Sequence, residues 1–206
     1  MTTFYIVRHG ETEWNTQKLL QGSSDSPLTE KGISQARESA EYFKNHTFAA
    51  VFSSDLLRAS RTAEFIAKEH DLLVKTSQLM RERNFGSYEG RKVGEFRAEL
   101  KRMVNGLSQL EKQSFKLVEG MESDEEVIGR LLTFLREVAL AYDGQNVLIV
   151  THSGVIRLLL THFGFASQEE MDGLTIKNLA HIQVDCDGTE FFIRDTHNII
   201  KQEYYK

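Results

Sequence analysis

Apolar residues occur along the chain in two patterns, as short unbroken runs and as longer stretches in which they recur every three or four positions. The short runs predict β-strands that are buried on both faces, as in a parallel sheet. The longer stretches predict amphipathic helices. The predicted strands are Phe4–Val7, Ala49–Phe52, Leu72–Lys75, Asn146–Thr151, Ala180–Val184 and Phe191–Arg194.

The predicted helices lie between these strands. One follows Thr29, an N-cap candidate, and carries an apolar stripe through Ile33, Ala36, Ala40 and Phe43. The others are Asp55–His70, Asp124–Ala141 and Val155–Phe163. Alternation of strands and helices predicts an α/β fold: a three-layer α/β/α sandwich with a mostly parallel central sheet and one antiparallel edge strand. The last two strands form a hairpin through the turn at 185–189.

Two stretches do not follow either pattern. Residues 13–27 form a polar segment that ends at Pro27, and we expect a loop there. Residues 91–123 are highly charged and in part helical, which predicts an insertion over about 83–123 that forms a small helical cap. Because no repeat or flexible linker divides the chain, we predict a single domain over residues 1–206.

Composition and charge exclude several classes of function. The net charge of −5 argues against a general affinity for nucleic acid. No apolar run approaches the roughly 18 residues that a membrane span needs, and we find no secretory signal at the N-terminus. A lone cysteine, Cys186, fits a reducing compartment. We therefore expect a cytoplasmic protein without a membrane or nucleic-acid partner, and a homodimer is left open.

Polar side chains recur where predicted strands end. The first strand leads into Arg8-His9-Gly10, and Asn146–Thr151 leads into His152. The helix after the second strand carries Arg58, and Glu82 follows the third strand. Ligands bind beyond the carboxyl ends of strands in open α/β sheets, so we expect two imidazoles, two guanidiniums and one carboxylate to meet there.

Such a cluster predicts a dianionic ligand, because its cationic groups would otherwise repel one another. Guanidinium groups match phosphate oxygens in bidentate geometry. With a phosphoryl group bound, one imidazole can attack phosphorus while the other and the arginines neutralise the developing charge. Glu82 is the candidate general acid for the leaving group and then the base for water.

Two other kinds of site fit less well. A metal site at His9 and His152 would place a cation beside Arg8 and Arg58, and the sequence has no HExxH motif or Cys/His ligand spacing. A Ser-His-Asp hydrolase lacks its GxSxG motif, although Ser153 follows His152 directly. We therefore expect no metal.

The segment Val7-Arg8-His9-Gly10-Glu11-Thr12-Glu13-Trp14-Asn15 resembles the signature of the histidine phosphatase superfamily, which includes the cofactor-dependent phosphoglycerate mutases. Further matches to the family pattern follow in the family's order. They are Gln21-Gly22, Leu28–Gly32, Ser53–Ala59, Arg81–Gly90 and Thr151–Gly154. The resemblance covers nearly the whole chain and is weakest over 91–120 and after Gly164.

The resemblance implies a role for each matching residue. His9 would be the phosphorylated nucleophile and Glu82 the proton donor, with Arg8, Arg58 and His152 completing the phosphate pocket. The substrate-binding candidates are Asn15, Gln21, Gly22, Arg83 and Ser153.

Three functions follow from the resemblance: a phosphomonoesterase for small phosphorylated metabolites, a phosphoglycerate mutase, and a binding protein without turnover. Presence of all five catalytic candidates argues against the third. The short insertion of mixed charge favours the phosphatase, which needs no cofactor, as does Thr151-His152-Ser153-Gly154 in place of the His-Gly-Asn arrangement typical of mutases. A mutase would be primed by 2,3-bisphosphoglycerate. Similarities to both sugar bisphosphatases and ribazole-phosphate phosphatases leave the substrate open.

Overall fold

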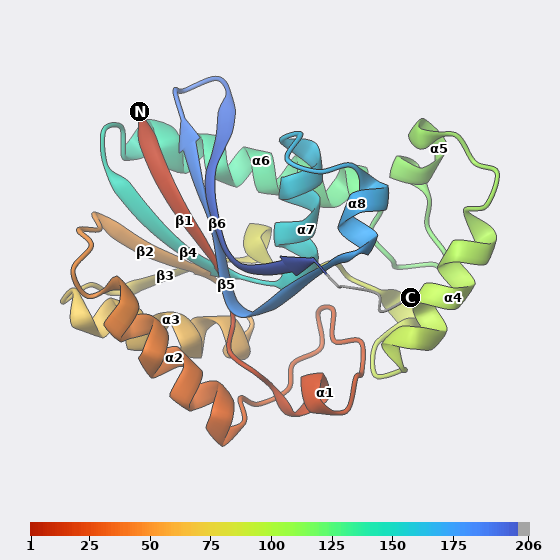
Figure 1. Cartoon of the computed structure of the whole chain (residues 1–206), viewed down its shortest axis with the longest axis horizontal. Helices are drawn as coiled ribbons and strands as arrows, with labels where there is room; N and C mark the ends of the chain where they lie inside the picture. The colour runs from red at the N-terminus through yellow and green to blue at the C-terminus, as the bar shows by residue number, and fades with distance from the viewer. Residues whose placement is uncertain (202–206) are drawn as a thin grey trace.

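The computed structural model describes residues 1–201 and contains one six-stranded sheet of order β3-β2-β4-β1-β5-β6 (Figure 1). The strands are β1 (Thr2–Arg8), β2 (Ala50–Ser54), β3 (Val74–Ser77), β4 (Asn146–Thr151), β5 (Leu174–Cys186) and β6 (Phe191–Lys201). The first four pair in parallel, and β5 runs antiparallel to both of its neighbours. The predicted fold class is confirmed. The antiparallel strand lies one place in from the edge, which β6 occupies.

Helices cover both faces of the sheet, because successive side chains of a strand point to opposite faces. On β4, Val147 and Ile149 pack against α6 (Asp124–Ala141) and α7 (Ser153–His162), whereas Leu148 and Val150 pack against α2 (Glu30–Phe43) and α3 (Leu57–Glu69). The two pairs of helices are seen on either side of the sheet in Figure 1. Thr29 caps α2 as predicted, its hydroxyl accepting from the Gly32 N–H at 2.9 Å.

The last two strands are longer than their apolar runs predict. β5 begins at Leu174 rather than Ala180, and β6 continues to Lys201 rather than ending at Arg194. Much of β6 is exposed, so its backbone pairs with β5 without a continuous apolar run to signal it. The third strand is displaced by two residues from its predicted start, to Val74.

The predicted loop at 13–27 contains a short helix, α1 (Glu13–Thr16), held by a capping box between Thr12 and Asn15. A helix of one turn is too short to show an apolar period. Residues 202–206 of the predicted domain lie outside the described residues.

The charged segment forms α4 (Val93–Met103) and α5 (Gln109–Ser114), which lie at one end of the molecule (Figure 1). Phe96 of α4 packs in a small cluster of its own with Leu20, Tyr88 and Met121. That this segment caps the site stays a prediction. The remaining short elements are the 3-10 turns η1 (Gln78–Met80) and η2 (Gly86–Tyr88) and the helix α8 (Gln168–Asp172). Among helices within residues 1–201, none combines the length and apolar composition required to span a membrane.

Candidate active site

The two histidines meet because they follow neighbouring parallel strands at the same level. Arg8 at the end of β1 is paired in register with Thr151 at the end of β4. The next residues, His9 and His152, are both buried, and their ring centroids lie 5.2 Å apart. The His9 backbone N–H also donates to the Thr151 carbonyl at 3.0 Å. The strand-end argument from the sequence therefore correctly predicts this pair.

The orientation of the His9 ring is set by its own loop. Nδ1 lies 2.7 Å from the carbonyl oxygen of Gly10. A carbonyl only accepts hydrogen bonds, so Nδ1 must carry the proton and the lone pair is left on Nε2. The Gly10 N–H donates to the Thr62 hydroxyl at 3.1 Å, and that hydroxyl donates to the Arg58 carbonyl at 2.8 Å. In its neutral form the ring therefore keeps its lone pair on Nε2.

Glycine is required at position 10 because the loop lies directly on the start of α2. A Cβ there would lie 2.6 Å from the Gly32 carbonyl oxygen, well inside van der Waals contact. Because that neighbour is backbone, it cannot move aside without displacing the helix. A side chain at Gly10 would therefore shift the loop that orients His9.

Arg58 enters the site from the first turn of α3 and is buried. Its Nη1 donates to the Ser24 carbonyl at 2.8 Å and to Asp25 Oδ1 at 3.0 Å, and its Nη2 donates to the Gly22 carbonyl at 2.7 Å. Asp25 also accepts from the Leu57 N–H at the start of α3. Reasoning from the sequence missed Asp25, because a turn-rich segment gives no sign of which distant arginine it will meet.

Several buried nitrogens of the cluster have no hydrogen-bond partner among residues 1–201. They are Nε of Arg8, Nε of Arg58 and both ring nitrogens of His152. Arg8 is otherwise held by one bond, from Nη1 to the Ile176 carbonyl at 2.6 Å. A buried polar group without a partner costs free energy, so such groups are expected where a ligand binds. A phosphoryl group would offer acceptor oxygens to the two guanidinium Nε atoms and to the one protonated nitrogen of the neutral His152 ring.

Burial and the neighbouring guanidiniums both act on the histidines. Burial, followed by the charges of Arg58 and Arg8, holds the pKa of His9 well below its usual range. The pKa of His152 is lowered in the same way, chiefly by burial and then by Arg58. Burial also lowers the pKa of Arg8 to about 10, although Glu82 opposes the shift. Both imidazoles are therefore neutral at pH 7, as a nucleophile requires.

Glu82 lies beside the start of α7. Its carboxylate accepts from the Gly154 N–H at 2.9 Å and from the Arg83 N–H at 3.0 Å. A Cβ at Gly154 would lie 2.4 Å from Glu82 Oε1 and would displace the carboxylate from this position. Arg130 of α6 donates to the Glu82 carbonyl at 3.2 Å and to two carbonyls just before it. The carboxylate is thus buried and fixed next to the helix that His152 begins.

Three of the predicted substrate-binding residues surround Thr12 and Arg58. Asn15 Oδ1 accepts from the Thr12 N–H at 3.2 Å, and Gln21 Nε2 donates to the Thr12 hydroxyl at 2.7 Å. Gly22 is in the left-handed region with a φ of 59° and presents its carbonyl to Arg58. These contacts join Asn15, Gln21 and Gly22 to the loops of the cluster.

The other two predicted substrate-binding residues have different surroundings. Arg83 forms an ion pair with Asp124 at the start of α6. Ser153 is the half-buried first residue of α7, directly after His152. Ser153 therefore lies at the cluster, whereas the Arg83 guanidinium is paired with Asp124 of α6.

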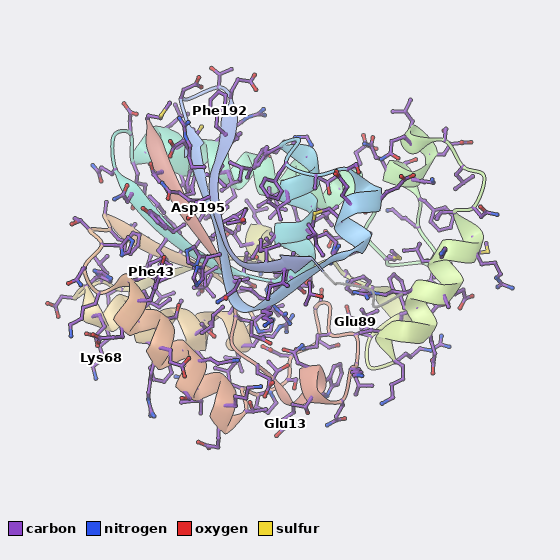
Figure 2. The ribbon with its side chains drawn as sticks, viewed as in Figure 1. Glu13, Phe43, Lys68, Glu89, Phe192 and Asp195 are labelled. Atoms are coloured by element: carbon purple, nitrogen blue, oxygen red, sulfur yellow. The ribbon has the colours of Figure 1, made fainter. Side chains whose placement is uncertain are left out.

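Two further residues, to which the sequence analysis assigned no role, hold the loops together. Glu89, which Figure 2 labels, accepts from the N–H groups of Ser23, Ser24 and Phe85 and so links the loop after α1 to the loop of Glu82. Asn178 of β5 donates to the His9 carbonyl at 3.0 Å. A polar residue inside a strand gave no signal of this contact.

The chain is similar to known proteins along nearly its whole length. The family model described as "Histidine phosphatase superfamily (branch 1)" matches residues 4–199. The chain is 36% identical over 195 residues to "Uncharacterized phosphatase PhoE" of Bacillus subtilis, covering 95% of this chain and 94% of that protein. It is 36% identical over 190 residues to "Probable phosphoglycerate mutase GpmB" of Yersinia pestis, covering 90% and 85%.

A solved structure agrees with these relatives. Phosphoserine phosphatase from Entamoeba histolytica, in complex with 3-phosphoglyceric acid, superposes with a TM-score of 0.80 at 26% identity, covering 95% of this chain and 96% of that one.

Proposed function

The chain belongs to the histidine phosphatase superfamily, and from that premise we propose that it hydrolyses small phosphorylated metabolites through a phosphohistidine at His9. The observation that carries the proposal is the state of His9. Its ring is buried, its Nδ1 is bound to the Gly10 carbonyl, and its pKa is lowered by burial, Arg58 and Arg8. Such an imidazole offers Nε2 as a neutral nucleophile within a cluster that favours a dianion.

In the first proposed step, Nε2 of His9 attacks phosphorus. A P–N bond forms as the ester P–O bond breaks, and Glu82 gives its proton to the leaving alkoxide. Arg8, Arg58 and His152 donate hydrogen bonds to the non-bridging oxygens, where charge develops.

In the second step, Glu82 takes a proton from a water molecule. The water oxygen attacks phosphorus and the P–N bond breaks, which restores His9 and releases inorganic phosphate. Every step uses groups of this chain and water, so we propose no metal and no cofactor.

The surroundings of Glu82 support hydrolysis over the mutase reaction. A phosphoglycerate mutase must also bind the carboxylate of its sugar acid. The two arginines that flank Glu82 are both bound to carboxylates of the protein: Arg81 is bidentate on Asp55, at 2.7 and 2.6 Å, and Arg83 pairs with Asp124. A phosphate ester without a second anionic group fits these surroundings better. The mutase remains the alternative because of the relative named for that activity.

The test is phosphate release from a panel of phosphorylated metabolites and p-nitrophenyl phosphate in the presence of a chelator. The panel includes 3-phosphoglycerate, assayed for 2-phosphoglycerate with and without 2,3-bisphosphoglycerate. We expect release by the wild type and none by His9→Ala. Isomerisation that outruns release would establish the mutase instead. Absence of both activities would overturn the proposal.

A further inference from the structure

The pairing of β5 with β6 contains one large irregularity. Ile176 pairs with Ile199 and His181 pairs with His197, so residues 177–180 of β5 lie opposite the single residue Asn198. At this bulge Leu179 has a φ of 59°, in the left-handed region that a bulky side chain rarely adopts. Strand pairing alone does not favour such a conformation. Bulges of this kind often lie next to active sites, where they redirect a side chain.

The side chain that this bulge redirects is Asn178. Its Nδ2 donates to the His9 carbonyl at 3.0 Å and lies 3.3 Å from Asn15 Oδ1. Just before the bulge, the Ile176 carbonyl accepts from Arg8 Nη1 at 2.6 Å. The same short segment of β5 therefore binds the backbone of the nucleophile, the guanidinium beside it and the amide of Asn15.

We infer that Asn178 is a positioning residue, which fixes the His9 peptide through its side-chain amide and thereby places the imidazole for attack. The inference rests on the proposed phosphohistidine chemistry. The contact acts through the backbone: the His9 carbonyl belongs to the peptide that leads to Gly10, whose own carbonyl binds His9 Nδ1. Movement of that peptide moves both the ring and the acceptor that sets its tautomer.

The test uses Asn178→Asp, which keeps the size of the side chain but removes its N–H donors. The introduced carboxylate would face the His9 carbonyl and Asn15 Oδ1, both of which are acceptors in this arrangement. We expect kcat for p-nitrophenyl phosphate to fall by about 10- to 100-fold at pH 8, because misplacement of a reacting group by about 1 Å has an effect of this order. For Asn178→Ala, which adds no charge beside the proposed phosphate pocket, KM should change by less than kcat.

The matched control is Asn198→Asp, which makes the same substitution at the exposed residue facing the bulge, where φ is also left-handed, at 57°. Its kcat should stay within about twofold of wild type, since an exposed substitution away from packed contacts has little effect.

A pH profile separates positioning from a structural role. On acidification towards pH 5 the carboxyl group of the Asn178→Asp variant gains a proton and can donate again, so its kcat relative to wild type should rise. The kcat of Asn178→Ala relative to wild type should not change with pH. If Asn178→Asp does not fold, Asn178→Ala still tests the loss of the donor. A pH-independent ratio for Asn178→Asp, or wild-type kcat in both variants, would overturn the inference.

The position of the ring can also be measured without turnover. NMR resonances of the His9 imidazole should change in Asn178→Asp and Asn178→Ala but not in Asn198→Asp. Unchanged resonances in all three would overturn the inference even if the wild type proved to be inactive. An inactive wild type would count against the proposed function alone, so the two failures are distinguishable.

Discussion

Two pairs of arginines, in two regions of the candidate site, have different surroundings. Arg8 and Arg58 flank His9, and each keeps a buried Nε without a partner among residues 1–201. Arg81 and Arg83 flank Glu82, and both are held by carboxylates, of Asp55 and Asp124. Arg58 is also paired with Asp25, but both arginines of the first pair retain the Nε donor for a ligand, whereas the second pair stabilises the loop that carries Glu82. The role of each arginine therefore depends on which acceptors the fold brings to its guanidinium group, and not on how close it lies to a motif.

The largest effect on activity is expected for substitution of His9, which Arg8 and Arg58 flank. His9→Ala should lower kcat by at least about four orders of magnitude, since removal of a covalent nucleophile has effects of this size. The measurement is phosphate release, together with trapping of a labelled phosphoenzyme by an alkaline denaturing quench, because the P–N bond of a phosphohistidine hydrolyses in acid. Circular dichroism should show an unchanged fold. Near-normal release would contradict the role of His9.

The next largest loss of activity is expected for Glu82→Gln, and its size should depend on the leaving group. For alkyl phosphates we expect kcat to fall by about 10²- to 10⁴-fold, the usual contribution of a general acid. The loss should be much smaller for p-nitrophenyl phosphate, whose phenolate hardly needs a proton. Steady-state kinetics on both substrates provides the measurement, and equal losses would remove Glu82 from the role of acid.

Titration of the histidines tests whether Arg8 and Arg58 are available for a ligand. Because burial, Arg58 and Arg8 lower the pKa of His9, its ring should stay neutral as pH falls through 6.5, the value for an unperturbed histidine. A bound phosphate dianion offsets the arginine charges, so inorganic phosphate should raise the pKa of both His9 and His152. Imidazole NMR shifts recorded with and without phosphate give the comparison. Identical titrations would mean that the dianion binds elsewhere.

The smallest effect is expected in the second region. Arg83→Ala should change kcat/KM by less than about threefold and lower the free energy of unfolding by about 1 kcal/mol, as expected for a partly exposed ion pair. Urea unfolding of Arg83→Ala, Asp124→Asn and the double variant isolates the contribution of the pair. Arg58→Ala, assayed in parallel, should lose far more activity. Equal losses in the two arginine variants would break the distinction between the regions.

Sequence patterns predicted the parallel half of the fold best. The bounds of α6 and β4 match the predicted helix and strand at both ends, because one has a continuous apolar stripe and the other an unbroken apolar run. They predicted β5 and β6 only in part, since strands with one exposed side carry mixed residues.

The same difference separates the parts of the site. The sequence predicts that His9, His152 and Arg8 lie close together, because they stand at the ends of predicted strands. The contacts of Asp25 and Asn178 could not be predicted, because they depend on loop conformation and on a bulge, which leave no periodic signal in the sequence. The catalytic roles stay predictions that the variants above would test.

The contact between His9 and Asn178 also bears on how the protein is made. The two residues are separated by 169 positions, and Arg8 and Ile176 by 168. A chain emerging from the ribosome presents all five predicted catalytic residues once β4 and the start of α7 have appeared, yet the strand that fixes the nucleophile is still to be synthesised. We therefore expect nascent chains that stop before Leu174 to be inactive, so that catalysis begins only after β5 has been synthesised.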